Sequence, residues 1–122
     1  MAVSRPDLRT YIAPSIKMGD MSMPEPDIVV APPTSEDYVP LELVALAVEV
    51  SDSTLALDLG RKAALYARNG IREYWVCDIT ARVIRQMWSP QGEVYAERRE
   101  VAFGESVVAI TVAGLTVELV GI

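Results

Sequence analysis

Histidine is absent from the 122-residue chain, and cysteine occurs once, at Cys77. The chain therefore cannot supply a Ser-His-Asp triad, a Cys-His pair or a histidine-ligated zinc site. A single cysteine cannot form an intrachain disulfide, so we expect a reducing, cytoplasmic environment. Any catalysis would depend on carboxylates, lysine, hydroxyl groups or a metal ion bound by oxygen atoms.

Long apolar runs are also missing. The longest uninterrupted one covers residues 43–48, far short of the roughly 18 residues that suggest a membrane span. The N-terminus has no signal-peptide core, so we expect no membrane association. Hydrophobic residues make up 51% of the sequence, which is enough for the buried core of one domain at this length.

Basic charge is scarce in the first half of the chain. The net charge is −6, and residues 18–60 contain nine acidic and no basic side chains. Residues 61–99 contain eight basic and four acidic side chains. Because nonspecific binding to nucleic acid needs a basic surface, this composition argues against a general nucleic-acid binder.

The first elements expected along the chain are an arm, two strands and a helix. Three prolines and a glycine interrupt residues 1–24, so we expect an irregular N-terminal arm there and a single domain over residues 25–122. Residues 28–31 and 43–52 are typical of buried strands. The N-cap residues of "SDST" and apolar residues at helical spacing then predict one main helix over about residues 53–69.

Further strands are expected after the helix. "REYWVCD" and "ARVIRQMW" predict a hairpin through Ile79-Thr80, and "EVYAERREV" predicts the next strand after a turn at "SPQG". The segment around Gly114 predicts one or two more short strands. This order predicts an α/β or α+β fold, in which a mixed β-sheet carries the helix on one face.

Glu49 lies inside the most apolar strand, in "LVALAVEVSD". Burying an ionised carboxylate costs several kcal/mol unless a partner, a metal ion or water receives it. Because side chains alternate along a strand, Ala47, Glu49 and Ser51 share one face. Glu49 also lies near the carboxyl end of its strand, where the ligand sites of open α/β sheets gather. We therefore take it as a candidate site residue.

Asp27 and Lys62 complete the candidate site. Asp27 begins the earlier strand, so the two carboxylates converge at one end of the sheet if the two strands are antiparallel neighbours. Lys62 lies four residues after Asp58 and four before Tyr66, on one helix face from which its ammonium group could reach the carboxylates. Adjacent carboxylates favour a raised pKa on one of them or a divalent cation between them. With lysine and Mg²⁺ they would suit the activation of water and the stabilisation of charge on a phosphate.

Three segments of the sequence, "PEPDIVV", "AVEVSDSTLALDLGRKAALYARNGIREYWVCD" and "AGLTVELV", resemble a known family. It is the restriction endonuclease family of the Uma-two type, within the PD-(D/E)XK nuclease superfamily. The resemblance covers roughly residues 20–120 and is most specific between Glu49 and Asp78. It implies a restriction-endonuclease-like core and a metal-dependent endonuclease that acts on DNA, with Mg²⁺ as cofactor and Mn²⁺ as a possible substitute.

The resemblance also implies roles for individual residues. Asp27 and Glu49 would be Mg²⁺ ligands, the backbone carbonyl of Val50 a third ligand, and Lys62 the catalytic lysine. In the usual superfamily pattern the lysine follows the glutamate by two residues, a place that Ser51 takes in this chain. The family is similar in this departure, because its lysine lies on the following helix.

A second departure from the family concerns the N-terminus. Members normally begin with a helix and a hairpin, and this chain is expected to start after them, as a fold truncated at the N-terminus. The missing strands would leave an open sheet edge, and an open edge usually demands a partner. We therefore expect a homodimer that forms through a sheet edge.

Structural roles compete with the catalytic ones. Asp27 could cap a strand beside a proline, and Glu49 could form an ion pair with Lys62 or Arg61. Lys62 and Asp58 have the spacing of an ordinary surface pair on a helix, which contributes about 0.3–0.5 kcal/mol. The alternative function is therefore that of a catalytically inactive, truncated nuclease-like fold that acts as an assembly or interaction domain.

Overall fold

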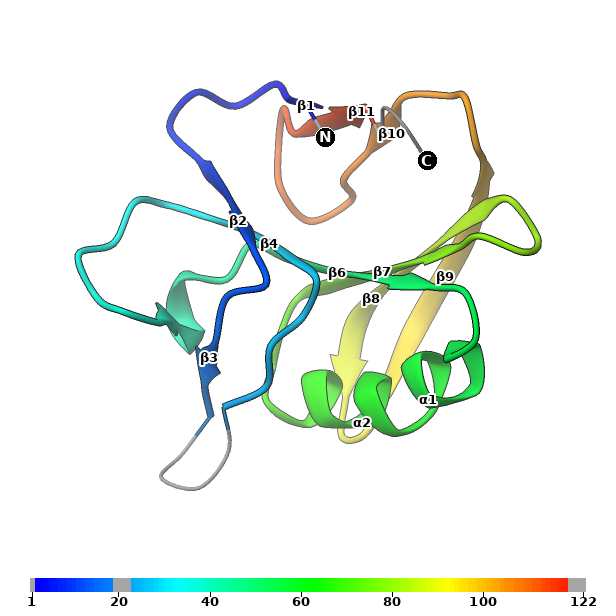
Figure 1. Ribbon diagram of the computed structural model, residues 1–122, viewed down its shortest axis with the longest axis horizontal. Helices are drawn as coiled ribbons and strands as arrows, with labels where there is room; N and C mark the ends of the chain where they lie inside the picture. Colours follow the sequence, from blue (N-terminus) through cyan, green and yellow to red (C-terminus); the bar gives the residue numbers. More distant parts are fainter. Residues whose placement is uncertain (1, 19–22, 119–122) are drawn as a thin grey trace.

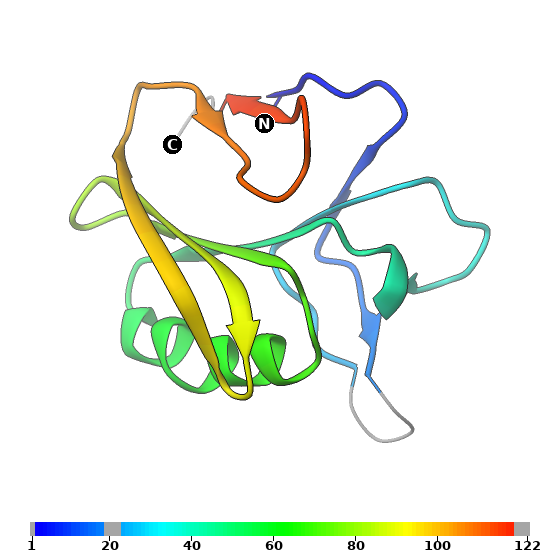
Figure 2. The same cartoon turned by 180° about the vertical axis from the view of Figure 1, so that it is seen from behind.

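The protein folds into three layers in the computed structural model, which describes residues 2–18 and 23–118 (Figure 1). A six-stranded sheet forms the middle layer, helices α1 and α2 cover one of its faces, and a three-stranded sheet covers the other (Figures 1 and 2). The expected mixed sheet with one main helical segment on one face is therefore confirmed. No helix of the described residues is long and apolar enough to cross a membrane.

The six-stranded sheet is mixed and has the order β2-β4-β6-β7-β8-β9. Only β6 and β7 pair in parallel, because the helical segment connects them, and all other neighbours in this sheet are antiparallel. The three-stranded sheet has the order β1-β11-β10, and β3 pairs with β5. The strands are β1 (Ala2–Val3), β2 (Arg9–Ile12), β3 (Ile16–Lys17), β4 (Ile28–Ala31), β5 (Val39–Pro40), β6 (Leu46–Ser51), β7 (Glu73–Asp78), β8 (Val83–Gln91), β9 (Val94–Ala102), β10 (Val107–Val108) and β11 (Thr116–Glu118).

Both faces of the central strands are buried, which explains their continuous apolar runs. On β6, Ala47 packs into the core on the helix side, whereas Leu46 and Val48 pack into the core under the three-stranded sheet. On β7, Tyr74 faces the helix side and Trp75 the opposite side. The period-two alternation of a strand thus supplies two cores from one run of apolar residues.

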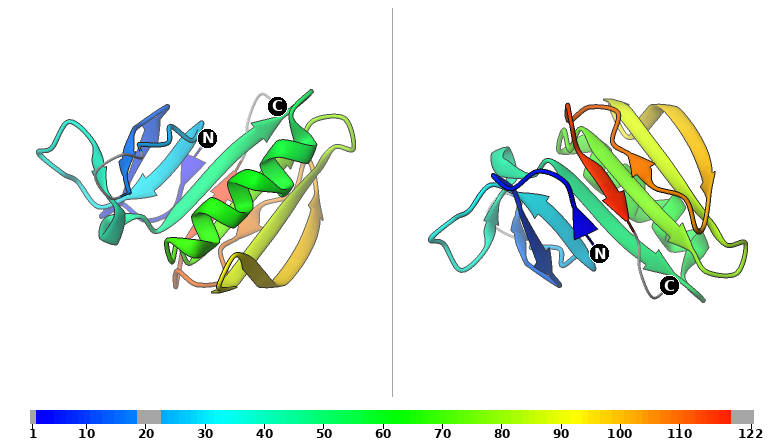
Figure 3. Two further views of the ribbon diagram at one scale, coloured as in Figure 1. Left: turned by 90° about the horizontal axis from the view of Figure 1, so that it is seen from below. Right: turned by 90° about the horizontal axis from the view of Figure 1, so that it is seen from above.

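The helical segment is divided by Gly60 into α1 (Leu55–Leu59) and α2 (Arg61–Arg68). Gly60 has φ −102° and ψ −91°, which is not a helical conformation. A Cβ atom at this position would lie 2.8 Å from the carbonyl oxygen of Ala56, so a side chain here would force the two helices apart. Glycine therefore permits the close turn that places α1 against one end of the sheet (Figure 3). A short 3-10 helix, η1 (Leu41–Leu43), precedes β6.

Two sequence-based predictions are wrong in detail. The arm over residues 1–24 is not irregular throughout, because β1, β2 and β3 lie within it and β2 pairs with the outer edge of β4. These strands are too short to show a period, so neighbouring strands rather than local pattern define them. The turn after β8 lies at Gly92-Glu93 instead of "SPQG", and Gly92 has the positive φ of 62° that a two-residue hairpin turn favours.

Glu73 fixes the three-stranded sheet to the main sheet. Its carboxylate is fully buried and accepts hydrogen bonds from the backbone N–H groups of Ile110 and Thr111, in the loop between β10 and β11. The hydroxyl of Thr111 and the indole N–H of Trp75 donate to the same carboxylate, at 2.9 and 2.7 Å. Several donors together replace the hydrogen bonds to water that the buried carboxylate group has lost.

Replacing Glu73 by alanine should lower the free energy of unfolding by about 3 kcal/mol, because it leaves several buried donors without an acceptor. Urea unfolding followed by tryptophan fluorescence measures this change. The matched control is Glu97→Ala on the exposed face of β9, which should change stability by less than about 0.5 kcal/mol. Equal stability of the two variants would contradict the anchoring role of Glu73.

Candidate active site

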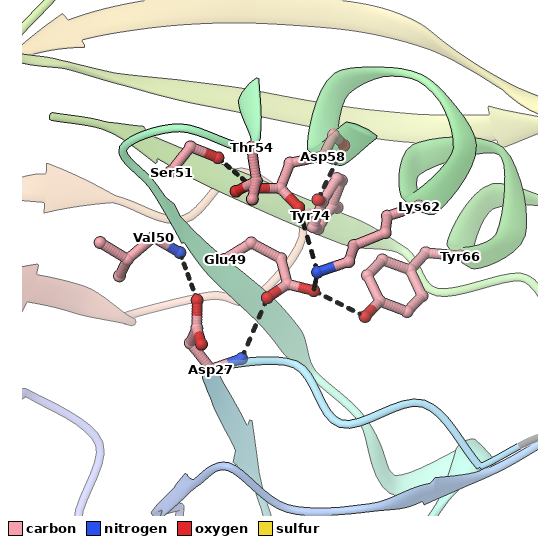
Figure 4. A network of polar contacts seen from close by, with 9 residues as sticks. All are labelled: Asp27, Glu49, Val50, Ser51, Thr54, Asp58, Lys62, Tyr66 and Tyr74. Atoms are coloured by element: carbon pink, nitrogen blue, oxygen red, sulfur yellow. Dashed lines mark hydrogen bonds and ion pairs between the residues drawn. The ribbon is translucent and has the colours of Figure 1, made fainter. Parts of the chain in front are cut away.

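Asp27 and Glu49 meet at one rim of the sheet, as the sequence predicts. Strands β4 and β6 pair antiparallel with Ile28 opposite Val48, so the residues one step further, Asp27 and Glu49, also lie side by side. The backbone N–H of Asp27 donates to Oε1 of Glu49 at 3.2 Å, and the backbone N–H of Val50 donates to Oδ2 of Asp27 at 2.7 Å (Figure 4). Each strand therefore holds the acidic side chain of the other.

Pro26 explains why the backbone is open at this rim. Extension of the β4–β6 register places Pro26 opposite Val50. In an antiparallel ladder the N–H and C=O of one residue face the same neighbouring strand, and a proline has no N–H to donate. The side chain of Asp27 accepts a hydrogen bond from the N–H of Val50. The carbonyl of Val50 faces Pro26, which has no N–H to donate.

The Glu49 carboxylate is buried, with 2% of the residue exposed. Its Oε2 accepts a hydrogen bond from the Tyr66 hydroxyl at 2.9 Å and lies 3.2 Å from Nζ of Lys62. Burial raises the pKa of Glu49, whereas the contacts with Tyr66, Lys62 and the Asp27 N–H act in the opposite direction. Burial and the neighbouring charge of Glu49 also raise the pKa of Tyr66, so that its phenol stays protonated and can donate.

Asp58 is a member of the site that the sequence analysis missed. Its expected role in a surface pair is wrong, because only 1% of the residue is exposed. Oδ1 lies 3.1 Å from Nζ of Lys62, and Oδ2 accepts hydrogen bonds from the hydroxyls of Ser51 and Thr54, the latter at 2.9 Å. Thr54 lies four residues before Asp58 and Lys62 four after it, a spacing that could have indicated a polar face turned toward the sheet.

Lys62 joins the two buried acids. Its ammonium group lies between Oε2 of Glu49 and Oδ1 of Asp58, and its side chain remains 35% exposed (Figure 4). Burial acts against the charge on Lys62, but the two carboxylates outweigh it and raise the pKa of the amine. Lys62 is therefore protonated at neutral pH, and it is the predicted partner of Glu49 in preference to Arg61.

The oxygen atoms at the rim belong to the chemical groups, carboxylates and a backbone carbonyl, that Mg²⁺ prefers as ligands. Three carboxylates and one ammonium group meet here, so the local formal charge is negative. Within residues 2–18 and 23–118, no group of three or more His, Cys, Asp or Glu side chains is arranged to hold a metal ion. Mg²⁺ does not require such a cage, because it commonly binds one or two carboxylates and completes its shell with water and substrate phosphate. Asp27, Glu49 and the Val50 carbonyl fit that pattern.

The chain is similar to nuclease-like proteins in sequence and in fold. A family model named Uma2, described as "Putative restriction endonuclease", matches residues 2–119. The structure is similar to that of a protein from Anabaena variabilis described as "a putative nuclease belonging to DUF820", with a TM-score of 0.56 and 15% sequence identity. The match covers 85% of this chain and 60% of the Anabaena chain, so this chain spans less than two thirds of that length. A search of curated proteins gave no match.

The buried state of Glu49 predicts a specific pH dependence. An acid whose pKa is raised on folding destabilises the folded state as the pH rises from its ordinary pKa, about 4.3, through the raised one. The free energy of unfolding of the wild-type protein, relative to that of Glu49→Gln, should therefore fall across this pH interval and stay constant above it. Urea unfolding at a series of pH values measures the difference, with Glu36→Gln at an exposed loop position as the control. If the wild-type protein instead became more stable relative to Glu49→Gln as the pH rises, the pKa of Glu49 would not be raised.

Proposed function

Because the chain belongs to the Uma2 family, whose model matches nearly its whole length, we propose that it is a metal-dependent endonuclease that hydrolyses DNA phosphodiester bonds. The proposed cofactor is Mg²⁺, with Mn²⁺ as a substitute. The observation that supports this proposal most strongly is the contact between Asp27, Glu49 and Lys62 at one rim of the sheet. These residues come from β6, the start of β4 and α2, so only the folded chain brings them together.

Asp27, Glu49 and the Val50 carbonyl are the groups that would hold the metal ion. When bound there, it would lower the pKa of a water molecule and polarise the phosphate. Glu49 must be ionised for this role, although its burial favours the neutral form. The hydroxyl of Tyr66, the N–H of Asp27 and the ammonium group of Lys62 all stabilise the ionised carboxylate, and they also fix its orientation.

Lys62 is the group proposed to position the nucleophile or to balance negative charge on the phosphate. Ser51 follows Glu49 by two residues, and its hydroxyl donates to Asp58, which contacts Lys62. These two contacts, from Ser51 to Asp58 and from Asp58 to Lys62, therefore bring an ammonium group from α2 to within 3.2 Å of Glu49. About a third of the lysine side chain remains exposed, so a substrate phosphate could reach it.

The alternative proposal is a catalytically inactive assembly domain. It draws support from the same ion pairs, because Lys62 already balances two buried carboxylates and would stabilise the fold without any reaction. It also draws support from the exposed edge strand β9, which offers a surface for the homodimer expected from the sequence. The two functions differ in whether Lys62 is needed for chemistry or for folding alone.

Nicking of supercoiled plasmid DNA separates these functions. The purified protein should nick DNA in the presence of Mg²⁺ or Mn²⁺, and Glu49→Gln and Lys62→Met should each reduce the rate at least about 100-fold. Lys17→Met is a matched control, since Lys17 is the other lysine of the chain and lies over the ring of Tyr38. A folded wild-type protein that stays inactive with both metal ions would favour the assembly domain.

Metal binding can be tested without any activity. Because Asp27 and Glu49 are held in place only in the folded state, Mn²⁺ should raise the melting temperature of the wild-type protein. Asp27→Asn should remove most of this gain, whereas Asp52→Asn, at an exposed position just after β6, should keep it. Differential scanning calorimetry with and without Mn²⁺ gives the result. An equal shift in the Asp27→Asn variant would place the metal ion elsewhere.

A further inference from the structure

Strand β9 is a long open edge of the main sheet. It covers nine residues, Val94–Ala102, and among residues 2–18 and 23–118 only β8 pairs with it (Figure 3). All of its residues are exposed except Tyr95 and Val101, and no proline interrupts it. An edge strand of this length presents a row of free backbone donors and acceptors, which a second strand can pair with.

The backbone groups that face outward can be identified from the ladder. The N–H of Phe103 donates to the carbonyl of Arg82 at 3.1 Å. With the register of the hairpin, this hydrogen bond identifies the residues of β9 whose backbone groups face β8. Because the direction of the backbone groups alternates along a strand, every second residue of β9 faces β8 and the others face outward. Over the regular part of the ladder, from Glu97 to Ala102, the outward-facing residues are Arg98, Glu100 and Ala102.

The charges along this edge are self-complementary. Arg98 lies opposite Met87, a residue of the core on the helix side, so Arg98 and Glu100 both project toward the helix side of the sheet. Glu100 also forms an ion pair with Arg85 at 3.1 Å. Arg99 projects to the other face, where it donates to the side chain of Gln86 at 2.8 Å and to the carbonyl of Val108 at 3.2 Å.

We propose that β9 pairs antiparallel with β9 of a second copy of the chain, about a two-fold axis at Arg99. This register places Arg98 opposite the partner subunit's Glu100, and the symmetry repeats that pair. The residues whose backbone groups face outward then exchange hydrogen bonds across the interface. The two main sheets join into one, with the helices of both subunits on the same face.

The charges select this register over its neighbours. A two-fold axis at Arg98 would set the two copies of Arg98 directly opposite each other, and an axis at Glu100 would do the same with Glu100. Like charges directly opposite each other destabilise a ladder. In the proposed register the two copies of Arg99 are opposite each other, but each is already directed inward by its contacts with Gln86 and Val108.

The inference is independent of the proposed nuclease activity. It depends on the free edge, the alternation of β9 and the order of its charges, and none of these involves Glu49 or Lys62. The homodimer would form whether or not the chain cuts DNA, so a failure of one proposal leaves the other standing.

Charge reversal tests the interface. Sedimentation equilibrium of the full chain should show a dimer, and Arg98→Glu and Glu100→Arg should each weaken it by about tenfold or more. The double variant Arg98→Glu with Glu100→Arg should recover most of the dimer, because it restores opposite charges across the interface even though each subunit loses the ion pair between Arg85 and Glu100. Arg72→Glu and Glu36→Arg, at exposed positions away from β9, are controls that should leave the dimer unchanged.

Cysteine cross-linking tests the register. At the axis, Arg99 and the partner subunit's Arg99 form a pair without mutual hydrogen bonds, whose Cα atoms lie about 4.5 Å apart, within the range for a disulfide. Under mild oxidation Arg99→Cys should form a covalent dimer on a non-reducing gel, whereas Arg98→Cys should not. Cys77 is buried and should not react. A monomeric wild-type protein, cross-linking at position 98 instead of 99, or a double variant as weak as the single ones would each overturn the proposal.

Discussion

The burial of one carboxylate, that of Glu49, is the constraint on which the site depends. The side chain lies on a central strand and is covered by a helix, so its charge persists only if nearby groups stabilise it. The hydroxyl of Tyr66, the ammonium group of Lys62 and the N–H of Asp27 all do so, and they come from three separate parts of the chain. The need to satisfy this charge therefore fixes how α2 and the start of β4 lie against β6.

The helical segment meets this need through a second buried acid. The break at Gly60 allows α1 to turn close to the sheet, where Asp58 accepts hydrogen bonds from Ser51 and Thr54. Asp58 in turn contacts Lys62 in the next helical turn and directs its ammonium group toward Glu49. A single acid beside this lysine would form an ordinary ion pair. The second acid leaves the cluster with excess negative charge, a condition that favours binding of a metal ion.

Part of this arrangement could be predicted from the sequence, because local pattern indicates the individual strands and the helix. The apolar run of β6 with one acid, the strand of β4 after Pro26 and the spacing of Lys62 on a helix predicted that three side chains meet, on the condition that β4 and β6 pair antiparallel, which the structure shows. The burial of Asp58 could not be predicted in the same way, because a spacing of four residues does not tell a buried pair from a surface pair. Strand β2 was missed because it depends on its pairing with β4, and residues 19–22 and 119–122 lie outside the described chain.

Asp27, Glu49 and the carbonyl of Val50 together form the proposed metal site at the rim of the sheet. The most direct test is an anomalous difference map from crystals of the protein soaked in Mn²⁺. The expected result is a peak within about 2.3 Å of a carboxylate oxygen of both Asp27 and Glu49, close to the distances of hard divalent cations. A peak at another place, or none in crystals that retain the contact between Lys62 and Glu49, would contradict it.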